Sequence, residues 1–190
     1  ISLMVQALGL PPKAMIDAGQ KHNVPIGALI GSADHAVRQV EFGVDVLVAQ
    51  GTEAGGHCGE ITTMVLVPEV IKRLQESGHG DVPVLAAGGI VTGRQMAAAM
   101  TMGAAGAWTG TLWLPTMESE LADVMRDKYV KAHSRDTVRS RASSGKLARQ
   151  LRSAWTDAWA QEDGPGPLPM PFQPLLAEQM RERAIKSAQN

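Results

Sequence analysis

Short apolar runs alternate along the first part of the chain with segments in which apolar residues recur at helical spacing. Runs without a polar break are typical of strands buried on both faces, which occur in parallel sheets covered by helices. Glycines and prolines separate the two kinds of segment, as expected for turns. The pattern predicts strands within residues 1–8, 24–30, 46–49, 82–87 and 105–109, and helices over about residues 12–22, 32–42, 68–77 and 92–102.

Residues 64–67 form one further apolar run, which follows Thr62 and Thr63 and directly precedes Pro68. Proline is tolerated in the first turn of a helix, because the N–H groups there have no partner within the helix. We therefore expect the third helix to begin at Pro68, with Val70, Ile71 and Leu74 on its buried face. Strand and helix repeat in this way over residues 1–115, which indicates an α/β fold with a parallel sheet.

The pattern changes after Leu112, and helical patches are predicted over residues 118–132 and 146–159. Residues 164–174 hold five prolines, so we expect them to form neither a helix nor a central strand. This segment is predicted to be an extended arm laid over a hydrophobic groove, followed by an amphipathic helix over residues 175–187. We therefore divide the chain into residues 1–115 and a helical C-terminal region, residues 116–190.

The composition is that of an ordinary globular protein, with 44% hydrophobic residues and a net charge of −1. Nine Lys and Arg but two Asp and Glu lie between residues 126 and 152. We interpret this segment as a solvated or self-docking basic face; the alternative is a docking surface for nucleic acid or an acyl carrier. No apolar run approaches the roughly 20 residues that span a bilayer. Cys58 is the single cysteine and we expect it to be inert, in a protein of the reducing cytoplasm.

The stretch from Val44 to Gly59 carries the clearest candidate chemistry. Its apolar run ends at Gln50, and the composition then changes to glycines and polar groups. Ligands of parallel α/β proteins bind where strands end, because loops and helix N-termini converge there. Gly55 and Gly56 leave room for close backbone approach just before His57, which can accept and release a proton near neutral pH. The alternative is a surface loop with a solvated histidine.

Two further strand ends carry glycine, in Ala87-Gly88-Gly89 and in Thr109-Gly110-Thr111. Backbone N–H groups in such turns bind a phosphate without a basic side chain. The alternative is a pair of tight turns with no ligand. A Gly-x-Gly-x-x-Gly motif, a phosphate-loop lysine, Cys-x-x-Cys and His-Glu-x-x-His are all absent from the sequence, so a dinucleotide fold and a metal site have no support.

Three motifs together resemble the nitronate monooxygenase family: the loop from Gln50 to Gly59 with its Glu-Ala-Gly-Gly-His core, Ala87-Gly88-Gly89-Ile90, and Thr109-Gly110-Thr111. The resemblance implies a parallel (β/α)8 TIM-barrel fold, of which this chain supplies about five βα units. It also implies FMN as the cofactor, an alkyl nitronate or nitroalkane and O2 as substrates, and His57 as the catalytic base. Carried over by motif, the flavin contacts fall on Gln50, Gly55, Ala87, Gly88, Gly89, Thr109, Gly110 and Thr111.

The chain departs from the family pattern in two respects. Some relatives carry a lysine on an earlier strand, but the matching residues here, 27–30, are Gly-Ala-Leu-Ile. The N-terminal part of the barrel is also absent, so we expect either a segment of a longer protein or a second copy of the chain to complete it. The alternatives are a flavin-dependent enoyl-acyl-carrier-protein reductase, which shares the histidine loop and a triplet like Thr62-Thr63-Met64, an NAD(P)H:quinone reductase, or a fragment without turnover.

Overall fold

The structure is a computed structural model that describes residues 1–164 and 166–189. Pro165, in the predicted arm, and Asn190 lie outside the described residues. The chain forms two compact units: the first comprises residues 1–54 and 59–109, and the second comprises residues 55–58 and the chain from Gly110 onward. Among the described helices, none is long and apolar enough to cross a membrane.

The first unit contains a five-stranded sheet in which every pair of neighbouring strands is parallel. This confirms the predicted parallel α/β fold. The strands follow one another across the sheet in chain order, which is the winding of a (β/α)8 barrel and differs from the reversing order of a doubly wound sheet. The sheet does not close among the described residues. Its strands, in order, are β1 (Met4–Gln6), β2 (Ile26–Ile30), β3 (Val46–Gln50), β5 (Val84–Ala87) and β6 (Gly106–Trp108).

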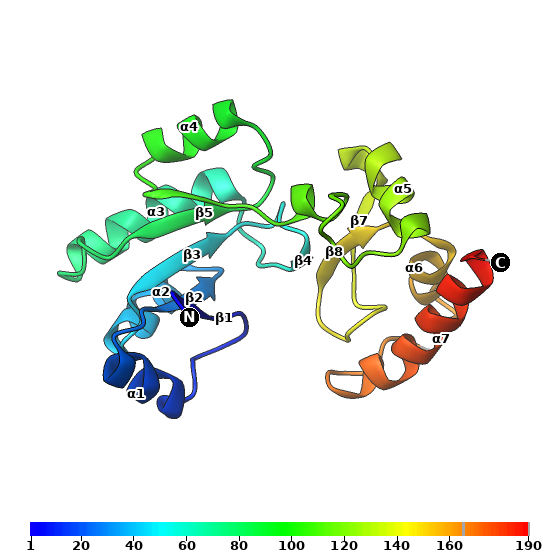
Figure 1. The fold of residues 1–190 in the computed structure, drawn as a ribbon, viewed down its shortest axis with the longest axis horizontal. Coiled ribbons are helices and arrows are strands. Elements are labelled where there is room, and N and C mark those ends of the chain that lie inside the picture. Colours follow the sequence, from blue (N-terminus) through cyan, green and yellow to red (C-terminus); the bar gives the residue numbers. More distant parts are fainter. Residues whose placement is uncertain (165, 190) are drawn as a thin grey trace. The chain divides into compact units, whose positions relative to one another are not determined.

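Four helices connect the strands, and right-handed crossovers between neighbouring parallel strands place them on one face of the sheet (Figure 1). They are α1 (Lys13–His22), α2 (Ala33–Glu41), α3 (Thr63–Glu76) and α4 (Gly93–Thr101). The core lies between this face and the helices, and includes Ile26 and Leu47 from the strands and Leu66 and Leu74 from α3. On the opposite face Leu29 and Leu85 are only partly buried.

The third helix begins at Thr63, so the prediction that it begins at Pro68 was wrong. Thr62 is extended and precedes the first turn. Leu66, Val67, Val70 and Leu74 are buried at helical spacing, whereas Met64 and Val65 are exposed. The apolar run of residues 64–67 therefore belongs to the beginning of an amphipathic helix and not to an extended segment. Pro68 is tolerated within the helix on its exposed side.

The second unit contains a small antiparallel sheet that the sequence pattern did not predict. Its strands are β4 (Gly56–His57), β8 (Ala148–Leu151) and β7 (Thr137–Ser140), with β8 in the middle. The helical patch predicted over residues 146–159 was wrong in its first half, because pairing with β4 and β7 overrides the local helical preference of this segment. The described helices of this unit are α5 (Asp123–Lys131), α6 (Ala154–Trp159), α7 (Phe172–Gln189) and the 3-10 turns Thr111–Trp113 and Ser134–Asp136.

The proline-rich arm is held by one buried side chain, Gln173. Its Oε1 accepts a hydrogen bond from the Leu168 N–H at 2.9 Å, and its Nε2 donates to the Ala142 carbonyl at 2.7 Å. The arm passes close to Gly145, where a Cβ would lie 2.9 Å from the Pro169 carbonyl carbon. Helix α7 begins at Phe172, three residues before the predicted start, because a first turn accommodates Pro174.

Candidate functional site

The carboxyl ends of β3, β5 and β6 lie side by side in the first unit, as the sequence predicted. Gln50 pairs with Ala87, and Ala87 pairs with Trp108, so these three residues form one row across the sheet. Residues paired across a sheet share a face, and this row lies on the face opposite the helices, together with Val48 and Leu85. The predicted contacts Gln50 and Ala87 are therefore neighbours at one sheet edge.

A hydrogen-bond cluster around Thr63 joins the loop after β3 to the turn after β5. The Thr63 N–H and hydroxyl both lie near Glu53 Oε2, at 2.9 Å and 3.0 Å. The same hydroxyl lies 3.2 Å from the Ala87 carbonyl and 3.1 Å from the Gly88 carbonyl. Because the carboxylate is charged, it is the strongest acceptor for the single hydroxyl proton. We call this set, Glu53, Thr63 and the carbonyls of Ala87 and Gly88, the Thr63 cluster.

Two glycines are required by the close packing around the Thr63 cluster. A Cβ on Gly51 would lie 2.6 Å from the Thr63 Cα, and a Cβ on Gly88 would lie 2.7 Å from the Thr63 hydroxyl. Gly88 also has a φ of +116°, a conformation that favours glycine. The sequence singled out the loop from Gln50 to Gly59 and the Thr62-Thr63-Met64 triplet, but not the contact between Glu53 and Thr63, because ten residues separate them.

The turn after β5 presents backbone N–H groups that suit an anion. Within the described part of the chain, the N–H groups of Gly89 and Ile90 make no hydrogen bond. Gln95 of α4 holds this turn through two hydrogen bonds. Its Nε2 donates to the Gly89 carbonyl at 2.7 Å, and its Oε1 accepts from the Thr92 N–H at 3.0 Å. Two unpaired N–H groups before a helix form a cradle that fits a phosphate.

Gln95 is a candidate site residue that the sequence did not single out. The signal for it was the spacing of Thr92 and Gln95, which is that of a capping box. The structure has that capping box at the start of α4. A capping box explains the helix start, but it does not reveal that the same amide also holds the Gly89 carbonyl.

His57 lies on β4 of the second unit, half-buried and opposite Ala148 of β8. Its Nε2 lies 2.7 Å from the Ser144 hydroxyl oxygen. In the same unit Gly55 approaches Thr111, because a Cβ on Gly55 would lie 2.8 Å from the Thr111 hydroxyl. The remaining predicted site residues divide between the two units: Gln50, Ala87, Gly88, Gly89 and Thr109 belong to the first, and Gly110 belongs to the second.

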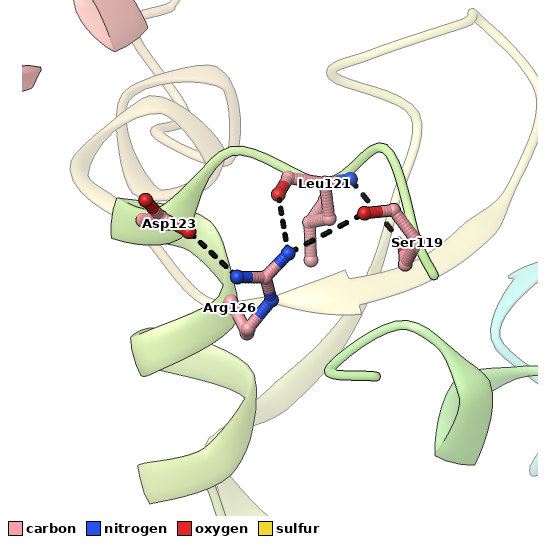
Figure 2. Close-up of polar contacts among 4 residues, drawn as sticks. All are labelled: Ser119, Leu121, Asp123 and Arg126. Atoms are coloured by element: carbon pink, nitrogen blue, oxygen red, sulfur yellow. Dashed lines mark hydrogen bonds and ion pairs between the residues drawn. The ribbon is translucent and has the colours of Figure 1, made fainter. Parts of the chain in front are cut away.

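Arg126 forms a second polar cluster in the same unit, at the start of α5 (Figure 2). Its Nη1 lies 2.6 Å from the Asp123 carboxylate, and its Nη2 donates to the carbonyls of Ser119 and Leu121 at 3.4 Å. The cluster closes the loop that leads into the helix. An open depression beside it is lined by Trp113, Leu114, Thr116, Glu118 and Ser119. Within residues 1–164 and 166–189, no three His, Cys, Asp or Glu side chains gather as a metal site would require.

Comparison with known proteins places the chain in a family. Residues 2–190 match the nitronate monooxygenase family, and the chain belongs to it. A Mycobacterium tuberculosis H37Rv protein named as a monooxygenase, Rv1533, is 50% identical over 188 residues, which are 99% of this chain and 49% of that protein. The chain thus spans about half the length of this relative.

Two solved structures are similar to the chain over almost all of its length. Nitroalkane oxidase from Streptomyces ansochromogenes is 28% identical, with a TM-score of 0.83 over 97% of this chain and 54% of that one. FabK from Thermotoga maritima is 33% identical, with a TM-score of 0.77 over 98% of this chain and 55% of that one. The fold of these relatives agrees with the barrel-type winding of the five-stranded sheet.

The Thr63 cluster predicts a stability difference between two neighbouring threonines. Thr63→Val removes the hydroxyl without changing the volume much, and takes from the Glu53 carboxylate one of the two hydrogen bonds that Thr63 donates to it, so we expect a loss of about 1–3 kcal/mol in the free energy of unfolding. Thr62→Val is the matched control, because Thr62 is exposed and its side chain makes no capping bond. Urea unfolding of both variants measures the difference, and equal stabilities would contradict a structural role for the cluster.

Proposed function

We propose that this chain forms the C-terminal part of the FMN-binding barrel of a nitronate monooxygenase. The observation that supports this most directly is the pair of N–H groups at Gly89 and Ile90, which have no partner among the described residues and lie beside the row formed by Gln50 and Ala87. Family membership supports the same activity. In this proposal residues 1–115 supply the barrel strands, and residues 116–190 form the appended region.

The proposed cofactor contacts follow from the chemistry of each position. The turn formed by Gly88, Gly89 and Ile90 would hold the FMN phosphate through its N–H groups, and the Thr63 cluster would keep that turn in place. Gln50 would donate a side-chain hydrogen bond to the flavin from the strand end. Further flavin contacts are proposed on Gly55, Ala87, Thr109, Gly110 and Thr111.

His57 is the proposed general base. Its imidazole would take the proton from the carbon next to the nitro group of a neutral nitroalkane, which leaves the nitronate anion. The protonated ring would then hold that anion through its positive charge and N–H groups. FMN, when bound, supplies the oxidation of the nitronate with O2, and that chemistry belongs to the cofactor.

The base role predicts a selective loss in His57→Asn. Asparagine keeps a polar side chain of similar size but cannot accept the proton, so turnover of a neutral nitroalkane should fall by about 10²–10⁴-fold. Turnover of the pre-formed nitronate should fall far less, because its proton has already gone. Oxygen uptake with nitroethane and with ethylnitronate measures both, and FMN absorbance checks that the cofactor stays bound.

His133→Asn is the matched control, since this exposed histidine makes no side-chain contact with a candidate residue. It should leave both activities unchanged. An equal loss on nitroethane and on ethylnitronate in His57→Asn would refute the base role.

The second candidate is a reductase on the same scaffold, acting on an enoyl-acyl-carrier-protein or a quinone. The observation that favours it is the position of Thr63, since the resemblance to that reductase rests partly on the Thr62-Thr63-Met64 triplet and Thr63 lies at the strand ends. The similarity to FabK and to nitroalkane oxidase is comparable in extent, so the two candidates need a direct test.

Anaerobic addition of NADH or NADPH to the flavin-loaded protein separates the two candidates. A monooxygenase that oxidises nitronates should leave the flavin absorbance near 450 nm, the usual flavin band, unchanged over minutes. Rapid bleaching by either nucleotide would contradict the monooxygenase proposal and favour the reductase. Addition of ethylnitronate under the same conditions is the positive control, because it should bleach the band.

A further inference from the structure

The His57 imidazole and the Ser144 hydroxyl are in hydrogen-bond contact within the second unit. We propose that Ser144 is a positioning residue that fixes the tautomer of His57, with the proton on Nε2 and the lone pair on Nδ1. The proposal deepens the proposed function, since it names the ring nitrogen available to accept a proton. It rests on three contacts of one hydroxyl group.

The Ser144 hydroxyl has a single proton to donate. Its oxygen lies 3.1 Å from the Lys146 carbonyl, which can only accept, so the hydroxyl proton is directed there. The Lys146 N–H lies 3.4 Å from the same oxygen and can only donate to it. The remaining contact, 2.7 Å to His57 Nε2, is therefore one in which the hydroxyl oxygen accepts and Nε2 carries the proton.

The position of the proton on Nε2 determines the role of Nδ1 of His57. In the part of the chain that the structure describes, the imidazole forms its hydrogen bond with Ser144, and that contact uses Nε2. With the proton fixed on Nε2, a neutral ring keeps its lone pair on Nδ1. Nδ1 is then the nitrogen that can take a proton from a substrate, while Nε2 stays bonded to Ser144 in both protonation states.

The small antiparallel sheet holds both His57 and the turn that carries Ser144. Ser144 lies in the turn between β7 and β8, and β8 also pairs with β4, which carries His57. The carbonyl of Ala142 in this turn accepts hydrogen bonds from Trp155 Nε1 at 3.3 Å and from Gln173 Nε2 at 2.7 Å. One small sheet and its anchored turn therefore hold both partners of the contact, which is what a positioning role requires.

The tautomer can be read directly by NMR on protein labelled with 15N-histidine, at an alkaline pH where histidine rings are neutral. We expect His57 to show a protonated Nε2 and an unprotonated Nδ1, with a ring N–H that exchanges slowly with water. The signal is assigned by its absence in His57→Asn. In Ser144→Ala we expect a mixture of both tautomers and loss of the slow N–H signal.

Two variants keep the test specific. Ser144→Thr retains the hydroxyl and should restore the wild-type signal. Ser143→Ala makes the same chemical change one residue away, where the hydroxyl contacts Gln150 at 2.7 Å, and should leave the His57 signal unchanged. An unprotonated Nε2 in the wild type, or a Ser144→Ala spectrum identical to the wild type, would overturn the proposal.

Turnover of the two substrates distinguishes a positioning role of Ser144 from a merely structural one, which would lower both activities together. Ser144→Ala should lower turnover of nitroethane by about tenfold, as for other residues that orient a functional histidine, and should leave turnover of ethylnitronate close to wild type. The NMR test needs no substrate, so a failed base role in His57→Asn and a failed tautomer assignment are separate results. Equal losses on both substrates in Ser144→Ala would contradict the positioning role.

Discussion

The geometry of the candidate site in the first unit depends on the hydrogen bonds made by the hydroxyl and the backbone N–H of Thr63. Both lie within 3.0 Å of Glu53 Oε2, and the hydroxyl also reaches the carbonyls at the end of β5. Through these contacts the start of α3 holds two loops that follow different strands. The packing is so close that Gly51 and Gly88 cannot carry a side chain. One residue therefore sets the positions of both strand ends.

The proposed phosphate cradle is a consequence of that constraint. Gly88 and Gly89 have φ angles of +116° and +69°, so the turn after β5 adopts a conformation that favours glycine. Gln95 holds the Gly89 carbonyl from the first turn of α4. Within residues 1–164 and 166–189 the N–H groups of Gly89 and Ile90 make no hydrogen bond, which is why we propose them as the phosphate donors. Left-handed backbone, helix capping and the proposed anion site thus belong to one short segment.

The sequence predicted the strands and their end residues because continuous apolar runs are local features, as at Val46–Gln50. It misplaced the start of α3, because the run before Pro68 has no polar residue to mark the exposed side. It missed β8, since only pairing with β4 and β7 makes that segment a strand. The sequence singled out His57 as a candidate from its loop, but Ser144 lies 87 residues away, so no local pattern connects the two.

Comparison of FMN with riboflavin tests the central claim, that the turn after β5 is a phosphate cradle, most directly. The two ligands share the flavin ring and differ in the phosphate. Charge-assisted hydrogen bonds from two backbone N–H groups contribute about 1.5 kcal/mol each, so FMN should bind at least about 100-fold more tightly than riboflavin. Fluorescence titration of the flavin-free protein measures both affinities. Equal affinities for FMN and riboflavin would contradict the account.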